Sequence, residues 1–157
     1  MERIACACET CKSYCVNIPG WFLLDEVRAT AAARGMDVRT LAARELVVDF
    51  WADEEHPVFL LRPATAADVP GEVAPMVPPR APCVYLTAGG ACEVHGTKPL
   101  ECAVAWHGEP PEVSVREMIR DAWDTDAGRA LVREALGREP VQPEATLADL
   151  LGMLARG

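Results

Sequence analysis

The sequence predicts a mainly α-helical fold with short β-hairpins. Three observations predict it: capped apolar stripes at helical spacing fill the last third of the chain, two runs of β-branched and aromatic residues flank a polar turn, and the size suits one core. A chain of 157 residues, 50% hydrophobic and 25% charged, has the length and composition of one globular domain. We therefore expect a small single domain over residues 1–157.

Two helices are expected in the first third of the chain. The stretch "IPGWFLLDEVRATAAARG" repeats its apolar residues at helical spacing, and we expect a helix that begins near Trp21 and ends at Gly35. In "MDVRTLAARE", Asp37 is expected to cap the N-terminus of a second helix, because its carboxylate can accept a hydrogen bond from a free amide of the first turn.

The middle of the chain is expected to contain two hairpins and a connector. The runs "LVVDFW" and "PVFLL" flank a polar turn, which favours a hairpin over a continuous helix. Residues 63–82 contain six of the thirteen prolines and are expected to form an extended connector. Beyond it, "CVYL" and "ACEV" flank the turn "TAGG" and predict a second, short hairpin.

Helices are also expected in the C-terminal part, residues 113–156. Ser114 and Glu117 form a capping box ahead of an apolar stripe, and "DAGRALVREALG" continues the helical pattern until Gly137. Thr146 and Asp149 resemble a further cap before a leucine-rich stripe. We expect these helices to pack on the core and on the loops that carry the cysteines.

The charge and the N-terminus limit the classes of partner. With 15 Lys and Arg against 24 Asp and Glu, the net charge is -9, which repels a phosphate backbone, so nucleic acid is not an expected partner. The sequence "MERIACACET" lacks the apolar stretch of a signal peptide, and the longest apolar runs are too short to cross a bilayer. We therefore expect a cytoplasmic protein without a membrane partner.

Seven cysteines form two groups, one within "CACETCKSYC" and one between residues 83 and 102. Their odd number, in a compartment that keeps thiols reduced, argues against a disulfide framework. Four thiols within ten polar-flanked residues are also hard to bury as core residues, whereas such short spacings let a loop wrap soft donors around a metal. The sequence thus predicts a metal site, around which residues 6–107 are organised, with these ligands: Cys6, Cys8, Cys11, Cys15, Cys83, Cys92 and Cys102.

The identity and number of the metals stay open at this point. Seven thiolates overfill one tetrahedral zinc site and supply two sites only if one thiolate bridges them. An iron–sulfur cluster held by four thiolates, with three cysteines left over, fits the same sequence. His95 and His107 follow Cys92 and Cys102 closely enough to be nitrogen ligands, although each is more often a polar loop residue, and His56 is expected to be exposed.

The order of these motifs resembles a known family. "CETCKSYC", then "CVYL" and then "GACEVHGTKPLEC" are similar to the YkgJ-like family of zinc- or iron-chelating (CxxCxxCC) domain proteins, over about residues 6–107. The cysteines that match the family pattern are Cys8, Cys11, Cys15, Cys83, Cys92 and Cys102. The resemblance implies a metal-chelating, largely helical domain without a settled reaction.

The sequence also departs from the family pattern. Tyr14 stands where the family has the third cysteine of its opening motif, and Cys6 is an extra thiol that is a candidate to replace it. His95 stands where a tyrosine is usual, and Lys98 replaces an arginine. If Tyr14 has removed a ligand without replacement, the number or type of metals differs from that of the family.

Three functions follow from the predicted site. The first is a protein that binds zinc or iron, including iron in an iron–sulfur cluster, and is folded by the metal. The second is a metal-dependent or iron–sulfur enzyme of oxidoreductase type, for which Glu93, Glu101 and His107 are the acid–base candidates near the site. The third is a metal donor or sensor that acts through an unidentified protein partner. The sequence contains no P-loop, dinucleotide-binding glycine motif or serine-nucleophile motif.

Overall fold

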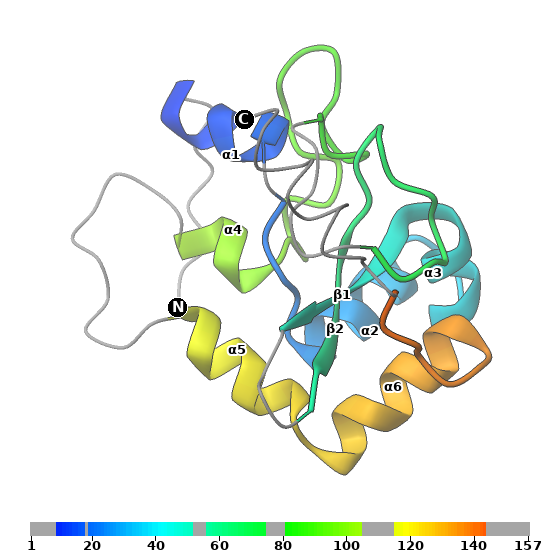
Figure 1. Ribbon diagram of the computed structural model, residues 1–157. Helices are drawn as coiled ribbons and strands as arrows, with labels where there is room; N and C mark the ends of the chain where they lie inside the picture. The colour runs from blue at the N-terminus through cyan, green and yellow to red at the C-terminus, as the bar shows by residue number, and fades with distance from the viewer. Residues whose placement is uncertain (1–8, 18, 52–55, 75–80, 105–114, 144–157) are drawn as a thin grey trace.

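The computed structural model describes residues 9–17, 19–51, 56–74, 81–104 and 115–143, and these are mostly helical around one two-stranded sheet (Figure 1). The helices are α1 (Glu9–Asn17), α2 (Leu24–Ala33), α3 (Val38–Glu45), α4 (Leu100–Val104), α5 (Val115–Trp123) and α6 (Asp126–Leu136), and the strands are β1 (Leu46–Trp51) and β2 (Val58–Pro63). The predicted combination of helices with a short hairpin is confirmed for this part of the chain.

The hairpin of β1 and β2 lies at the centre of the fold. The two strands pair antiparallel, from Leu46 opposite Pro63 to Trp51 opposite Val58, as the sequence predicts. The proline-rich connector then returns along the other edge of β1: the Val48 amide donates to the Glu72 carbonyl (3.0 Å), and the Val48 carbonyl accepts from the Ala74 amide (2.7 Å). The described part of the connector is therefore not extended throughout, because it turns between residues 66 and 72, but around Val73 it satisfies the backbone of a buried strand.

The first helix pair agrees with prediction except at its start. Asp37 caps α3, and its side chain accepts from the Thr40 amide at 2.7 Å. Helix α2 begins at Leu24, three residues after the predicted start, because Leu23 is extended and the Phe22 amide donates to the Leu61 carbonyl of β2 (3.0 Å). This hydrogen bond ties the segment before α2 to the sheet.

Helices α5 and α6 cover the hairpin, as expected from their apolar stripes. Their buried residues include Ile119, Trp123 and Leu131, and both helices contact β2, while α6 also packs on α3. Thr125 caps α6, and Gly137 ends it in the left-handed region (φ 68°), where a residue without Cβ is favoured. The predicted capping residue Ser114 and the expected helix beyond Thr146 lie outside the described residues.

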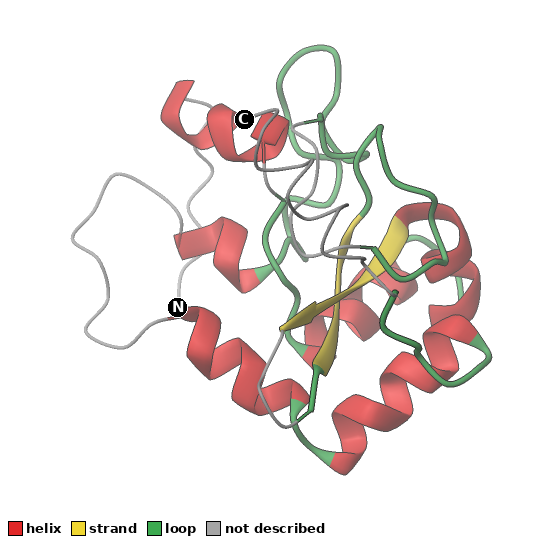
Figure 2. Cartoon of the chain, in the orientation of Figure 1, coloured by secondary structure: helices red, strands yellow, loops and turns green. Residues whose placement is uncertain are grey.

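An apolar core joins the hairpin to the helices. Its large, fully buried side chains come from the segment before α2, both strands, α2, α3, α5, α6 and the second predicted hairpin: Phe22, Val27, Leu41, Leu46, Leu60, Leu61, Tyr85, Ile119, Trp123 and Leu131. Figure 2 shows the longest loops and turns, drawn green, together with α1 at the end of the molecule away from α5 and α6. Hydrophobic burial thus organises the described fold, and this loop-rich end carries most of the cysteine-bearing segments.

The second predicted hairpin is only partly formed. Leu86 and Cys92 make a single antiparallel bridge, and the Thr87 amide donates to the Ala91 carbonyl (2.9 Å) across the turn. The chain therefore reverses where "TAGG" predicts it, although no regular strand is assigned between residues 81 and 104. Among the described helices, none has the length and apolar character needed to cross a membrane.

Candidate metal centre

Four cysteines from three segments lie near one another at the loop-rich end. Cys15 is on α1, Cys83 and Cys92 flank the turn, and Cys102 is on α4. The Cys83 amide donates to the Cys15 carbonyl at 2.7 Å, which brings the first cysteine group directly against the second. All four are free thiols; Cys83 is buried and the other three are partly buried.

The four thiols also interact electrostatically. Burial is the main cause that raises the pKa of each, to about 12 for Cys83, and ionised neighbours raise it further: Cys92 acts on Cys15, and Cys15 acts on Cys83 and Cys102. The positive charge of Lys98 acts in the opposite sense on Cys15 and Cys92. Burial, more than the neighbouring charges, therefore favours the protonated form of these thiols.

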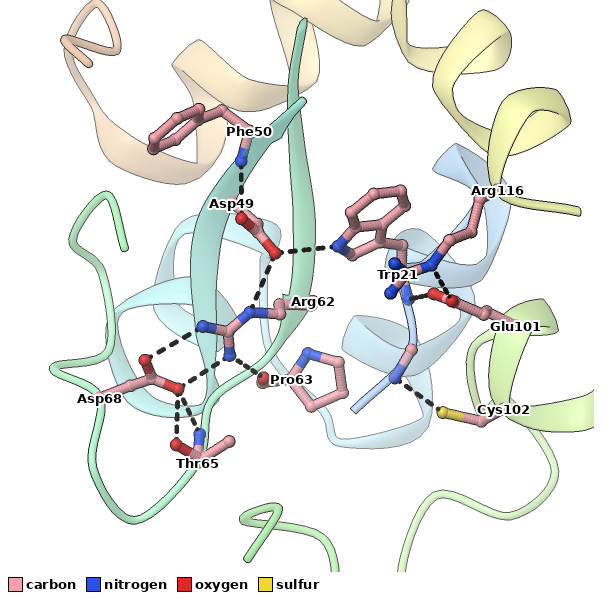
Figure 3. Close-up of polar contacts among 11 residues, drawn as sticks. Trp21, Asp49, Phe50, Arg62, Pro63, Thr65, Asp68, Glu101, Cys102 and Arg116 are labelled. Atoms are coloured by element: carbon pink, nitrogen blue, oxygen red, sulfur yellow. Dashed lines mark hydrogen bonds and ion pairs between the residues drawn. The ribbon is translucent and has the colours of Figure 1, made fainter. Parts of the chain in front are cut away.

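Cys102 and its neighbour Glu101 are held by two consecutive amides (Figure 3). The Gly20 amide donates to Cys102 Sγ at 3.1 Å, and the Trp21 amide donates to Glu101 Oε2 at 2.8 Å. The other oxygen of Glu101 pairs with Arg116 of α5, whose guanidinium lies 4.5 Å from the centroid of the Trp21 ring. Helix α4 is thus attached both to the segment before α2 and to α5.

The predicted acid–base candidates are already engaged in ion pairs or lie outside the described residues. Glu101 pairs with Arg116, and Glu93 Oε2 lies 3.2 Å from Arg34 Nη1. His107 lies outside the described residues. His56 is exposed, as expected, with 60% of its side chain accessible.

The described thiols are gathered but are not arranged as a ligand set. Among the residues that the structure describes, no three His, Cys, Asp or Glu side chains have an arrangement that could hold a metal ion. Cys6 and Cys8 lie outside this part of the chain, and Cys11 is on α1 with its side chain not described. The donor chemistry nevertheless fits a thiophilic metal, since four free thiols from three segments converge.

A second buried polar cluster was not predicted from the sequence (Figure 3). Arg62, 1% exposed, donates to Asp49 Oδ2 (3.2 Å) and to both oxygens of Asp68 (2.8 and 3.1 Å). The Trp21 indole donates to Asp49 at 2.9 Å, and the Thr65 amide and hydroxyl donate to Asp68. The sequence feature that could have predicted this cluster is a charged residue within each of two apolar strands, the aspartate of "LVVDFW" and the arginine of "FLLRP".

Burial affects the two aspartates of this cluster differently. It is the main cause that raises the pKa of Asp49, although hydrogen bonds from Trp21 and Arg62 oppose it. Burial also opposes the ionisation of Asp68, but hydrogen bonds from Arg62 and Thr65 outweigh it and lower the pKa of that carboxyl. We refer to Asp49, Arg62 and Asp68 as the ionic cluster.

Comparisons with family models, with curated proteins and with solved structures find no match for this chain. The resemblance to the YkgJ-like family therefore stays a prediction from its motifs. Any assignment of function has to come from the residues of the site and their surroundings.

Proposed function

We propose that this protein binds zinc or iron through its two groups of cysteines, with iron held in an iron–sulfur cluster. The observation that supports this most strongly is the meeting of Cys15, Cys83, Cys92 and Cys102 at one end of the fold. Thiolate sulfur is the ligand that zinc and iron–sulfur clusters prefer in proteins. The proposal includes Cys6, Cys8 and Cys11 as the remaining ligands.

The electrostatics of the thiols support the same proposal. A free thiol in apolar surroundings is chemically inert. The packing of a hydrophobic core does not require four cysteines close to one another. A bound cation would offset the negative charge of the ionised thiols, and its binding free energy would add to the stability of the fold. Metal binding is therefore expected to release protons and to raise the unfolding temperature.

The ion pairs of the nearby carboxylates favour a binding role over acid–base catalysis. Glu93 and Glu101 are each paired with an arginine, and Glu101 also accepts a backbone hydrogen bond. A general base needs an accessible lone pair within reach of a substrate. These two carboxylates instead brace the loops that carry the cysteines.

The test is to purify the protein without oxygen, record its visible spectrum, and measure zinc, iron and sulfide per chain. Stoichiometric zinc in a colourless protein, or iron with sulfide in a brown one, is the expected result. Cys83→Ser and Cys102→Ser should lose metal, whereas Ser13→Ala, on the exposed side of α1 between two predicted ligands, should keep it. A parent protein without metal that cannot be loaded with zinc or iron and sulfide would refute the proposal.

The rate of metal loss separates a structural site from a metal donor or sensor. A site that folds the protein should hold its metal against a mild chelator. A donor or sensor should release the metal to the same chelator while the protein stays folded. Metal content and circular dichroism, followed together after chelator is added, distinguish these two roles.

A further inference from the structure

The contact between Gly20 and Cys102 brings a backbone amide against a thiol from the other end of the sequence. The amide of Gly20 donates to Cys102 Sγ at 3.1 Å, across 82 positions of sequence. N–H···S contacts of this kind strengthen when the sulfur carries negative charge, as it does when it ligates a metal. The contact is therefore suited to a thiolate more than to a thiol.

The structure leaves no space for a side chain at position 20. A Cβ on Gly20 would lie 2.8 Å from the Cys102 amide nitrogen, 2.8 Å from Glu101 Cβ and 2.9 Å from Cys102 Sγ. Gly20 is not among the described glycines with positive φ, so the close approach of α4, rather than an unusual backbone conformation, requires glycine here. Two of these three contacts involve the backbone or Cβ of α4, which cannot rotate away.

The segment that provides this amide is rigidly held on the core. Trp21 and Phe22 are 2% and 0% exposed. The Trp21 indole donates to Asp49 (2.9 Å), and the Phe22 carbonyl accepts from the Trp123 indole (2.7 Å). The direction of the Gly20 amide is thus fixed by groups other than the cysteines.

We propose that Gly20 positions Cys102 as a ligand of the metal centre, by donating its amide hydrogen to the ligating sulfur and by leaving space for α4 to approach. This inference rests on the proposed metal-binding function. It assigns Gly20 a role that no cysteine motif indicates, because the residue lies between the two groups of cysteines.

The first test compares Gly20→Ala with Gly96→Ala, using cadmium(II) as a thiophilic probe in competition with a chelator. Gly96 lies in the loop between Cys92 and Cys102, and among the described residues nothing lies within 4 Å of a Cβ placed on it. Loss of a group that orients a ligand typically weakens metal affinity about 10–100-fold. We expect that loss for Gly20→Ala and less than about 3-fold for Gly96→Ala, a control that touches no ligand.

A double-mutant cycle separates positioning of the sulfur from a general effect on folding. In a Cys102→Ser background, Gly20→Ala should no longer change the cadmium affinity, because the sulfur through which it acts is gone. The inference is overturned if Gly20→Ala binds cadmium as tightly as the parent, or if it weakens binding by the same factor with and without Cys102. A parent that binds no thiophilic metal refutes the proposed function itself, so the two failures are distinguishable.

A second measurement keeps the inference testable if Gly20→Ala fails to fold. In the parent protein loaded with a spin-half isotope of cadmium, the Gly20 amide proton should show scalar coupling to the metal through the Cys102 sulfur. Coupling at the Gly20 amide supports the assignment. Resolved cadmium coupling at the ligating cysteines, without any at the Gly20 amide, overturns it.

Discussion

The ionic cluster is buried and the group of four thiols is partly buried, and of these two described sites the ionic cluster is the one whose charges are paired. Arg62 neutralises charge on Asp49 and Asp68, and donors from Trp21 and Thr65 complete the hydrogen bonding. At the loop-rich end, burial is the main cause that raises the pKa of Cys15, Cys83, Cys92 and Cys102. Neighbouring cysteines raise it further for Cys15, Cys83 and Cys102, while Lys98 opposes the rise at Cys15 and Cys92.

The difference explains how the two sites contribute to the molecule. A buried charge stabilises a fold only when its partner is present, and here the chain itself provides that partner for the ionic cluster. The described part of the chain gives the four thiols no such paired cation. The ionic cluster is therefore a part of the fold, whereas the thiols are the residues on which the proposed metal binding depends.

The largest expected effect comes from breaking the ionic cluster. Arg62→Met leaves two carboxylates buried without a cation and should lower the free energy of unfolding by about 3–5 kcal/mol, as measured by urea denaturation. The control is Arg28→Met, which removes an exposed ion pair with Glu134 and should cost less than about 1 kcal/mol. Equal stability of the two variants would mean that the ionic cluster is not a stabilising unit.

Because of its buried thiols, the metal-free protein should become less stable as the pH rises into the alkaline range. Folding raises the Cys83 pKa from 9.0 to about 12, so its stabilising effect is complete below pH 9 and is lost as the pH rises toward 12. Between these two pH values the Cys83 thiol should lower the free energy of unfolding by about 1.4 kcal/mol per pH unit. The slope in parallel urea titrations should be shallower for Cys83→Ala. Identical slopes would show that the Cys83 thiol titrates alike in both states.

Trp21→Phe tests whether the two sites are energetically separate. The change removes the indole donor to Asp49 and should cost about 1.5–3 kcal/mol of stability, the usual range for a hydrogen bond to a charged group. The Trp21 amide that supports Glu101 remains, so cadmium affinity should stay within about 3-fold of the parent, less than the loss of an orienting group brings. The control is Trp51→Phe, which changes the ring that packs edge-on against Trp21 but leaves the hydrogen bond from Trp21 to Asp49 in place. A large loss of metal affinity in Trp21→Phe alone would show that the sites are coupled.

The smallest effect is expected at the cap of α6. Thr125→Ala removes the oxygen that accepts from the Gly128 amide at 3.0 Å and should cost about 1 kcal/mol in thermal or urea unfolding. Thr125→Ser keeps this oxygen and should restore most of the stability. Metal affinity should be unchanged in both variants, and a parallel change in affinity would argue against separate sites.

Local signals predicted much of the fold. The Asp37 cap, the hairpin, and the helices that end at Gly35 and Gly137 all follow from residues close together in sequence, and the structure confirms them. The start of α2 was placed too early, because a long-range hydrogen bond from Phe22 to β2 competes with helical spacing. Sequence patterns do not report such contacts.

The site was less predictable than the fold. Grouping the cysteines correctly anticipated that Cys15 would meet Cys83, but it gave no indication of Gly20. Arg62 and its two aspartates are far enough apart along the chain that only strand pairing and the following turn unite them. Metal binding and the resemblance to a chelating family remain predictions.

The most direct test of metal ligation by the cysteines is X-ray absorption at the edge of the metal in anaerobically purified protein. We predict a first shell dominated by sulfur, at about 2.3 Å if the metal is zinc. Replacing Cys102 with serine should reduce the number of sulfur neighbours. A first shell of oxygen and nitrogen alone, with the cysteines still reactive toward alkylating agents, would contradict the proposal that these thiols are the ligands.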